Sequence, residues 1–451
     1  MDLKDKKVLV LGYARTGRGA AEFLVSQGAN VTINDLNDLS EEPSIKELKA
    51  KGVIVVDKKQ PVTLLNEKFD FIVKNPGIPY QIDLLQAAIA QEIPIYTDIE
   101  IFDWYNPGIL IGITGSNGKT TTTTLVDKIL QNSQYQAHLA GNIGIPTLSV
   151  LPKVKENDVV TMELSSFQLM GTDKFKPHIA AITNIFSAHL DYHGTREEYV
   201  KAKLRLIQNQ DNHDFIIFNA DQKELAGYVG ELPANKVPFA RLNLTDSVRQ
   251  TGAYYENGGL YFKGELIMKE NDIQIPGEHN IENILVAIAI TKILNVPNNI
   301  IHDTIMNYHG VEYRIQPVGS YNGIRYYNDS KATNPDATIT ALKSFTEPTV
   351  YIGGGLDRGI RFDELVPYLE NVKVAILYGE SKEIMKEAME QAQIAEIVMV
   401  DNLEQATKAA QSYAESGDVV LLSPACASWD QYQSFEERGA QFNELIAGLN
   451  Q

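Results

Sequence analysis

The sequence has 451 residues and a single cysteine, Cys426, so no disulfide can form within the chain. Its longest uninterrupted apolar run, Ile284–Ile290, is far shorter than the roughly 20 residues that cross a bilayer. Near the start, the run Val8–Leu11 is too short to be the core of a signal peptide. We therefore expect a cytoplasmic protein without a membrane span, in which Cys426 is a small core residue.

Positive charge is scarce in the chain, which has 40 lysines and arginines against 58 aspartates and glutamates. The formal net charge of -18 has the wrong sign for a surface that binds duplex nucleic acid, so we exclude nucleic acid as a partner. A small anionic ligand can still bind where a few cations converge on one cleft. The positions of individual lysines and arginines therefore carry more information than the total charge.

Strand-like and helix-like patterns alternate along the chain, which is typical of parallel α/β sheets. A chain of this length holds about three domains at roughly 150 residues each. The segment Val237–Pro276, rich in glycine and tyrosine, indicates an antiparallel β insertion. We expect an α/β fold of three domains: an N-terminal Rossmann-like domain (1–97), a central P-loop mononucleotide-binding sheet with the antiparallel segment (98–309), and a C-terminal Rossmann-like domain (310–451).

A glycine-rich loop lies between the apolar strand Ile109–Ile113 and a helix that begins at Lys119. In that position backbone N–H groups and the helix N-terminus can cradle phosphates. Lys119 would bridge the β- and γ-phosphates of a nucleotide, and Thr120 would offer its hydroxyl to Mg²⁺. Ile113 occupies the place of the usual first glycine, so a plain glycine turn capped by threonines is the alternative. The candidate nucleotide-binding residues of the loop are Gly115, Ser116, Asn117, Gly118, Lys119, Thr120 and Thr121.

A nucleotide site also needs an acidic group at the end of a neighbouring strand to hold its metal ion. Glu163 directly follows the apolar strand Val159–Met162, where ligands meet the strands of open sheets. A glutamate at such a place is otherwise an ordinary charge at the start of a helix. Its assignment as a metal ligand therefore depends on the phosphate loop.

Lys203 stands on the apolar face of a helix that the capping pattern Thr195-x-x-Glu198 predicts. One interpretation is that its stem lies across the apolar face while the amine reaches solvent. The other is that Lys203 faces a polar site. His189 precedes the same helix and follows a buried strand; a lone histidine is more often structural than a ligand.

The first strand is followed by Gly12–Gly17, a G-x-A-x-x-G pattern that departs from the full dinucleotide fingerprint. Ala14 replaces the glycine that lets a pyrophosphate approach the backbone closely. An NAD-dependent enzyme remains an alternative from this loop alone, but it would leave the second phosphate loop without a use.

Taken in order, the phosphate loop, Glu163, His189 and Ala202–Arg205 resemble the motifs of the Mur ligase family. The segments Asp329–Pro335 and Ser423–Ser428 extend the resemblance over all three expected domains. The resemblance implies a catalytic set of Lys119, Lys203, His189 and Lys331. It implies two Mg²⁺ ions, held by the ligand set Thr120, Glu163, His189 and Lys203, with Lys203 carbamylated so that a cation becomes a carboxylate.

The same resemblance assigns further residues to three substrates by their place in the family's motifs. For ATP, beyond the phosphate loop, these are Asn280, Asn283, Arg314 and Asp329. For a UDP-linked substrate, they are Arg15, Thr16, Asp35, Leu36, Asn142, Ser165 and Gln168. For D-glutamate, they are Lys331, Thr333, Arg358, Ser428 and Phe435. Some relatives carry lysine at the position of Arg358, and the match there is short.

The reaction that the resemblance implies belongs to the synthesis of peptidoglycan precursors. An ADP-forming ligase would join D-glutamate to UDP-N-acetylmuramoyl-L-alanine through an acyl phosphate, using ATP and acting as a monomer. One alternative is a ligase of the same family that adds another amino acid, such as L-alanine or a γ-linked glutamate. Another is a nucleotide-binding regulator that hydrolyses little ATP.

Overall fold

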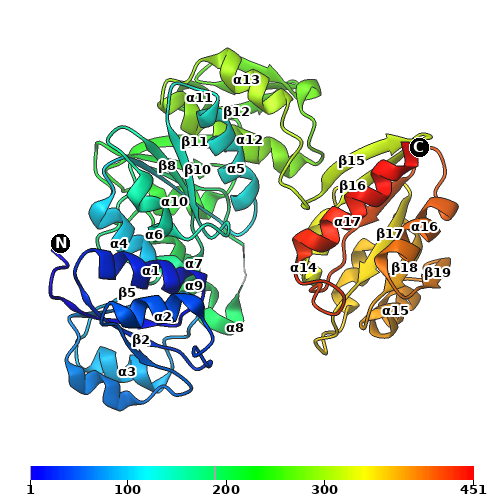
Figure 1. Ribbon diagram of the computed structural model, residues 1–451. Coiled ribbons are helices and arrows are strands. Elements are labelled where there is room, and N and C mark those ends of the chain that lie inside the picture. Colours follow the sequence, from blue (N-terminus) through cyan, green and yellow to red (C-terminus); the bar gives the residue numbers. More distant parts are fainter. Residues whose placement is uncertain (1, 187–188, 451) are drawn as a thin grey trace. The chain divides into compact units, whose positions relative to one another are not determined.

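The computed structural model describes residues 2–186 and 189–450, whose strands form three sheets (Figure 1). The chain divides into two compact units. The first unit, Met1–Asp272 with Ile281–Ile305, holds two of the sheets, and the second, Ile273–Asn280 with Met306–Gln451, holds the third. Most strand pairs are parallel, so the expected α/β fold with three sheets is confirmed.

The N-terminal sheet has five parallel strands in the order β3-β2-β1-β4-β5, as in a Rossmann-like half. Val8 and Val10 of β1 belong to one core cluster and Leu9 and Leu11 to another, so both faces of this strand are buried. The elements are β1 (Lys7–Leu11), α1 (Arg15–Ser26), β2 (Asn30–Asn34), α2 (Pro43–Ala50), β3 (Ile54–Val56), β4 (Phe71–Lys74), α3 (Asp83–Ala90) and β5 (Ile95–Tyr96).

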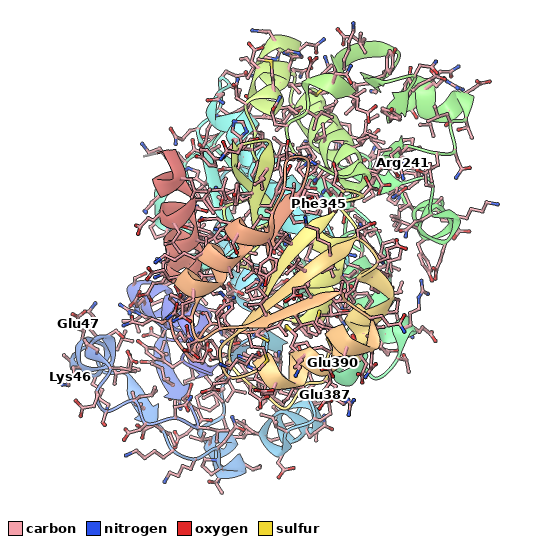
Figure 2. The ribbon with its side chains drawn as sticks, turned by 90° about the vertical axis from the view of Figure 1, so that its right-hand side faces the viewer. Lys46, Glu47, Arg241, Phe345, Glu387 and Glu390 are labelled. Atoms are coloured by element: carbon pink, nitrogen blue, oxygen red, sulfur yellow. The ribbon has the colours of Figure 1, made fainter. Side chains whose placement is uncertain are left out.

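The covering helices have one apolar and one charged side. In α2, Ile45 is buried in the core, whereas Lys46 and Glu47 are exposed (Figure 2). In α15 (Lys382–Gln391), Glu387 and Glu390 take the exposed positions. This spacing follows the period of the helix and leaves the charges in water.

Helix α4 (Asp98–Tyr105) joins the first two sheets of the first unit. The carboxylate of Glu100, which is 1% exposed, accepts backbone N–H bonds from Asp173 (2.9 Å) and Phe175 (3.0 Å). Just before the helix, the Thr97 hydroxyl donates to the carbonyl of Gln168 at 2.6 Å. One core cluster runs through both sheets, so the two parts are packed as one body.

The central sheet has nine strands in the order β14-β13-β12-β11-β10-β9-β6-β8-β7. The predicted antiparallel insertion is confirmed for β12–β14. It is wrong for β11, which pairs parallel with β10 and β12 because α11 makes a crossover between β11 and β12. The strands are β6 (Ile109–Thr114), β7 (Ala137–Gly141), β8 (Val159–Glu163), β9 (Ile179–Ile182), β10 (Phe215–Asn219), β11 (Asn235–Ala240), β12 (Ala253–Glu256), β13 (Gly259–Phe262) and β14 (Glu265–Lys269).

Helices of widely different length connect these strands. The apolar run of α12 is fully buried at Ile284–Ile290, and among the residues that the structure describes no helix is long and apolar enough to cross a membrane. The helices are α5 (Lys119–Gln131), α6 (Thr147–Val150), α7 (Ser166–Leu169), α8 (Leu190–His193), α9 (Arg196–Leu204), α10 (Lys223–Val229), α11 (Asp246–Thr251), α12 (Glu278–Ile293) and α13 (Asn298–Met306).

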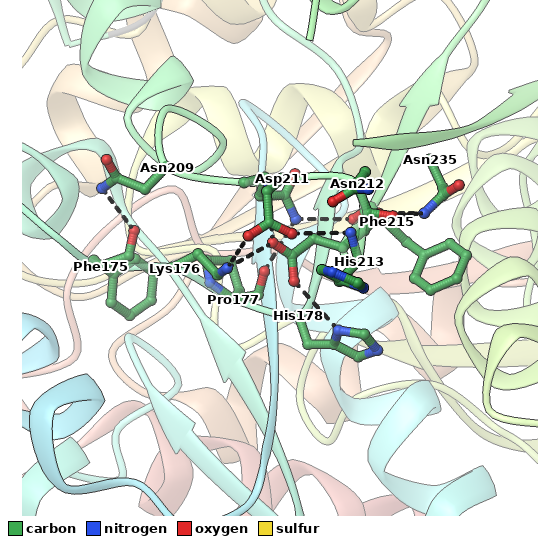
Figure 3. Close-up of polar contacts among 12 residues, drawn as sticks. Phe175, Lys176, Pro177, His178, Asn209, Asp211, Asn212, His213, Phe215 and Asn235 are labelled. Carbon is green, nitrogen blue, oxygen red and sulfur yellow. Dashed lines mark hydrogen bonds and ion pairs between the residues drawn. The ribbon is translucent and has the colours of Figure 1, made fainter. Parts of the chain in front are cut away.

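A charged cluster closes the amino ends of β9 and β10 (Figure 3). The Lys176 ammonium lies 2.7 Å from a carboxylate oxygen of Asp211 and 3.2 Å from one of Asp214, and Asp214 also contacts Nδ1 of His178 at 3.3 Å. The phosphate loop follows the opposite, carboxyl end of the neighbouring strand β6. The cluster therefore connects the two segments that precede β9 and β10. It lies at the amino ends of these strands, away from the phosphate loop.

The C-terminal sheet has the order β15-β16-β20-β17-β18-β19, with β15 antiparallel at one edge. Cys426 is buried near it, and burial raises the pKa of its thiol to about 11, as expected for a core residue. The elements are β15 (Gln316–Tyr321), β16 (Ile324–Asn328), α14 (Pro335–Leu342), β17 (Thr349–Gly354), β18 (Val372–Tyr378), α15, β19 (Glu396–Met399), α16 (Leu403–Tyr413), β20 (Val419–Leu422) and α17 (Phe435–Ala447).

Candidate functional site

The phosphate loop leaves β6 at Thr114 and enters α5 at Lys119, as the sequence predicts. A Cβ at Gly115 would lie 1.9 Å from the Thr183 hydroxyl oxygen, and one at Gly118 would lie 2.1 Å from Oδ1 of Asn283. Gly118 also has a φ of 81° at the N-cap of α5. The loop geometry therefore requires glycine at both positions.

The N-terminus of α5 is shaped to receive an anion. Gly118 provides no side-chain cap, so the positive end of the helix dipole is not screened by a capping oxygen. The Lys119 ammonium donates to the carbonyls of Gly115 and Ser116, both at 2.9 Å, and thus lies over the loop. The backbone N–H of Asn117 donates to Oδ1 of Asn184 at 2.9 Å, which fixes the far side of the loop.

Glu163 ends β8 beside the loop, because it is the register partner of Ile113 in β6. It is 2% exposed, and its Oε1 accepts a bond of 2.9 Å from the Asn142 amide. Its Oε2 is buried and has no hydrogen-bond partner within the described residues. Thr120, in the first turn of α5, is 7% exposed. A buried carboxylate oxygen left without a donor among the described residues fits the oxygen ligands of Mg²⁺, and so does a threonine hydroxyl.

Lys203 points into this polar site and not to solvent. It lies on α9, is 1% exposed, and donates through Nζ to the Gly115 carbonyl at 2.8 Å and to the Thr114 hydroxyl at 3.4 Å. Burial, assisted by the charge of Lys119 and opposed by Glu163, holds the pKa of the Lys203 amine well below its ordinary value. The predicted cap is present, since Thr195 accepts the backbone N–H of Glu198.

His189 borders the same place. Its ring centroid lies 6.4 Å from that of Tyr199, and the Lys203 ammonium lies 4.7 Å from the centroid of the same tyrosine ring. The ring of Phe167 lies 5.1 Å away on the other side. The structure therefore brings His189 and Lys203 to one aromatic wall, although they are fourteen residues apart in the chain.

Five of the seven residues expected at a UDP-linked substrate line one cavity of about 310 Å³ in the first unit. They come from the first turn of α1, the loop after β7 and the segment around α7. Ser165 and Gln168 also form the capping box of α7, so their side chains are held in place by its N-terminus. The five residues are Arg15, Thr16, Asn142, Ser165 and Gln168.

The other two, Asp35 and Leu36, line a second cavity of about 330 Å³. Gly77 borders both cavities, so they adjoin at the loop after β4. Asp35 accepts the backbone N–H of Tyr13 at 2.6 Å, which fixes the turn after β1. Leu36 is 65% exposed, as suits a side chain that packs on a ligand face.

In the second unit, Arg314, Asp329 and Lys331 line a cavity of about 190 Å³. Asp329 is 3% exposed and accepts a bond of 2.7 Å from the Ser423 hydroxyl. Burial raises the pKa of its carboxyl to about 7, although Ser423 and the charge of Arg314 lower it. The cavity lies at the carboxyl end of β16, where ligands bind in open α/β sheets.

The remaining residues expected at D-glutamate are not among those that line that cavity. The ammonium of Lys331 lies 5.7 Å from the ring centroid of Phe435, the first residue of α17. Thr333 follows Lys331 in the same loop, and its backbone N–H donates to the Lys331 carbonyl. The guanidinium carbon of Arg358 lies 4.9 Å from the ring centroid of Trp429. Ser428, which precedes Trp429 in the chain, is buried.

The two asparagines expected near adenine fall on different units. Asn283 lies in the first unit, with its Oδ1 3.3 Å from the Thr122 hydroxyl of α5. Asn280 lies in the second unit, where its amide donates to the Pro276 carbonyl at 2.6 Å.

Sequence reasoning missed two buried residues near the substrate cavities, Asp98 and Lys74. Asp98 is 1% exposed and lines the cavity of about 310 Å³, and burial raises its pKa to about 6. Both residues stand at the end of a strand or the start of a helix, where charged residues are commonly exposed. The only signal in the sequence was their nearness to the turns at 75–77 and 97.

Three domain families match the chain in succession. The Mur ligase MurD-like N-terminal domain matches residues 6–97, the Mur ligase middle domain matches residues 113–291, and the Mur ligase glutamate ligase domain matches residues 313–426. Together they extend over the three sheets and include the phosphate loop, Glu163 and Lys331.

Proteins of other organisms resemble the chain over nearly its whole length. The UDP-N-acetylmuramoylalanine--D-glutamate ligase of Latilactobacillus sakei is 46% identical, over 99% of this chain and 98% of that protein. The enzyme of the same name from Bacillus cereus is 45% identical, over 99% of each.

Solved structures show the same fold at low identity. UDP-N-acetylmuramate-alanine ligase MurC of Thermotoga maritima has a TM-score of 0.58 at 18% identity, covering 98% of this chain and 99% of that one. The MurF ligase of Thermotoga maritima, solved in complex with ADP, also has a TM-score of 0.58 at 18% identity, over 99% of this chain and 96% of that one.

The glycine requirement of the phosphate loop can be tested directly. Gly118→Ala forces a Cβ against Asn283 and a strained φ, so we expect it to weaken MgATP binding by about 10-fold or more in calorimetric titration. Gly227→Ala is the matched control, because it lies in α10 with open space around the added methyl group. Equal nucleotide affinity of Gly118→Ala and wild type would contradict the assignment of the loop.

Proposed function

The chain belongs to the Mur ligase family, and we propose that it joins D-glutamate to UDP-N-acetylmuramoyl-L-alanine, with hydrolysis of ATP to ADP and phosphate. The proposal rests on two features that lie together in the first unit. A phosphate loop with two lysines and a cavity lined by five residues expected at the nucleotide-sugar occur in one packed body. The names of the relatives at 45–46% identity support the same substrates.

In the first step, a carboxylate oxygen of the L-alanyl group attacks the γ-phosphorus of ATP. A P–O bond forms, the bond to the β-phosphate oxygen breaks, and an acyl phosphate and ADP result. Because two anions meet, positioning and charge neutralisation matter more than proton transfer. We assign this positioning and charge neutralisation to Lys119, over the phosphate loop, and to Lys331, in the second unit.

In the second step, the neutral amine of D-glutamate attacks the acyl carbon. A C–N bond forms, phosphate leaves with the C–O bond electrons, and the nitrogen loses a proton to give the amide. The mixed anhydride is reactive, so the site must exclude water. The two carboxylates of D-glutamate call for cations and hydroxyls together, which we assign to Lys331, Thr333, Arg358 and Ser428; Phe435 completes the proposed D-glutamate site.

Two Mg²⁺ ions would be held by Thr120, Glu163, His189 and a carbamylated Lys203. The buried Oε2 of Glu163, which has no hydrogen-bond partner within the described residues, supports Glu163 as one of these ligands. When bound, the ions neutralise the phosphate oxygens. In the described part of the chain no three His, Cys, Asp or Glu side chains gather closely enough to hold a metal by themselves. Phosphate oxygens and a carbamate would therefore complete the ligand set.

The chemistry of Lys203 favours carbamylation. Burial lowers the pKa of the Lys203 amine and so favours its neutral form, which is the form that attacks CO₂. The nitrogen forms a bond to carbon and releases a proton, so a buried cation becomes an anion beside Lys119. That charge suits a site for divalent cations, whereas an ammonium in the same place would repel them.

We further propose that ATP binds to the phosphate loop with Asn280, Asn283, Arg314 and Asp329, and that residues 1–97, 98–309 and 310–451 act as three domains. We also propose that the enzyme acts in the cytoplasm, where ATP is available as its phosphoryl donor, and that it acts as a monomer.

The substrate requirement of ADP release tests the function. We expect continuous ADP formation only when UDP-N-acetylmuramoyl-L-alanine and D-glutamate are both present, because the acyl phosphate gives up its phosphate only when an amine attacks it. A coupled ADP assay with each substrate omitted in turn measures this. Turnover with L-alanine in place of D-glutamate would indicate another ligase of the family, and no turnover with any amino acid would indicate a regulator.

The carbamate can be tested by chemical rescue. Lys203→Ala should lower kcat by about 100-fold, since a metal ligand is lost, and short carboxylates such as acetate should restore part of the activity. Lys201→Ala, an exposed lysine of the same helix, is the control and should keep full activity. Full activity of Lys203→Ala without added carboxylate would rule out the carbamate.

A further inference from the structure

A second buried lysine lies beneath the loop that separates the two nucleotide-sugar cavities. Lys74 is the last residue of β4 and is 1% exposed. Its ammonium donates to the carbonyls of Asn75 (3.2 Å) and Pro76 (3.1 Å), and it lies 4.6 Å from the ring centroid of Tyr80. The whole side chain is thus folded back under the turn that follows it.

That turn forms a wall of both cavities. Asn75 and Pro76 line the cavity of about 310 Å³, Ile78 lines the one of about 330 Å³, and Gly77 lines both. The turn is also fixed from outside, because the hydroxyl of Tyr192 donates to the carbonyl of Ile78 at 3.0 Å. Two independent donors therefore hold the backbone that a ligand in either cavity would touch.

The charge state of Lys74 responds to its surroundings. Burial lowers the pKa of its amine to about 7. Two phenols lie beside the amine and its turn: Tyr80, from the segment after the turn, and Tyr192 of α8, whose hydroxyl bonds to the carbonyls of the turn; the charge of Arg205 acts on the Tyr80 phenol and lowers its pKa. Burial raises the pKa of both, to about 12 for Tyr80, so both stay neutral near pH 8. An anion bound against the turn would therefore act on an amine that is mostly uncharged.

We propose that Lys74 is a positioning residue for the nucleotide-sugar: its amine braces the turn at 75–77, and the negative charge of the bound substrate draws a proton onto that amine. A dianion on one side of the loop favours the charged form on the other, because the buried environment screens little. Substrate affinity and proton uptake are then linked through one side chain. The inference rests on the proposed function, since it takes the nucleotide-sugar to be the ligand.

Calorimetric titration of the full chain with UDP-N-acetylmuramoyl-L-alanine at pH 8, in buffers of different ionisation enthalpy, measures the linkage. Wild type should take up roughly half a proton or more per substrate bound, since an amine with a pKa of about 7 is mostly neutral at that pH. Lys74→Met should lose this uptake and bind about 10-fold more weakly, with KM raised more than kcat is lowered.

Two further variants separate the inference from a merely structural role. Lys74→Arg keeps the charge and the donors at every pH, so it should bind better than Lys74→Met but show no uptake. Lys46→Met, an exposed lysine of α2, should behave as wild type. If wild type binds the nucleotide-sugar without more proton uptake than Lys74→Met, the inference is wrong. If wild type does not bind it at all, the proposed function itself fails.

Discussion

The amine of Lys203, withdrawn from water and bonded to the carbonyl of Gly115, is the contact on which the rest of the site depends. It ties α9 to the turn between β6 and α5, and so adds a second fixed point to the loop besides the bond from Asn117 to Asn184. Burial of an ammonium costs free energy unless it is paired or loses its proton. The low pKa of this lysine is the consequence, and it makes the residue available for chemistry.

A second buried lysine supports a loop in the N-terminal sheet of the first unit. Lys74 is buried beneath a ligand-facing turn as Lys203 is buried beneath the phosphate loop, and both donate to backbone carbonyls. Two loops to which we assign anionic ligands are thus held by buried amines whose pKa is lowered. Helix α4 and its Glu100 pack the first two sheets as one body, which keeps the cavities and the phosphate loop in a constant arrangement.

Much of the fold could be predicted from the sequence, because buried parallel strands and the turns after them are local signals. The strand, loop and helix around Lys119 and the apolar face that carries Lys203 were both found in this way. The orientation of β11 was not, since pairing direction depends on a crossover that no short window contains.

The family resemblance predicted more of the site residues than the residue pattern alone did. It placed Asn142 and Gln168 together with Arg15, which the structure brings into one cavity although they lie in different parts of the chain. Lys74 could not be found this way, because a lysine at the end of a strand is usually solvated and only the fold around Tyr80 shows that it is buried.

The central claim is that a phosphoryl group passes from ATP to a carboxylate. The most direct test uses UDP-N-acetylmuramoyl-L-alanine with ¹⁸O in its carboxylate and follows the label by mass spectrometry after turnover with D-glutamate. The released phosphate should carry one labelled oxygen, because the C–O bond breaks when the amine displaces the phosphate. Release of phosphate without the label would contradict it.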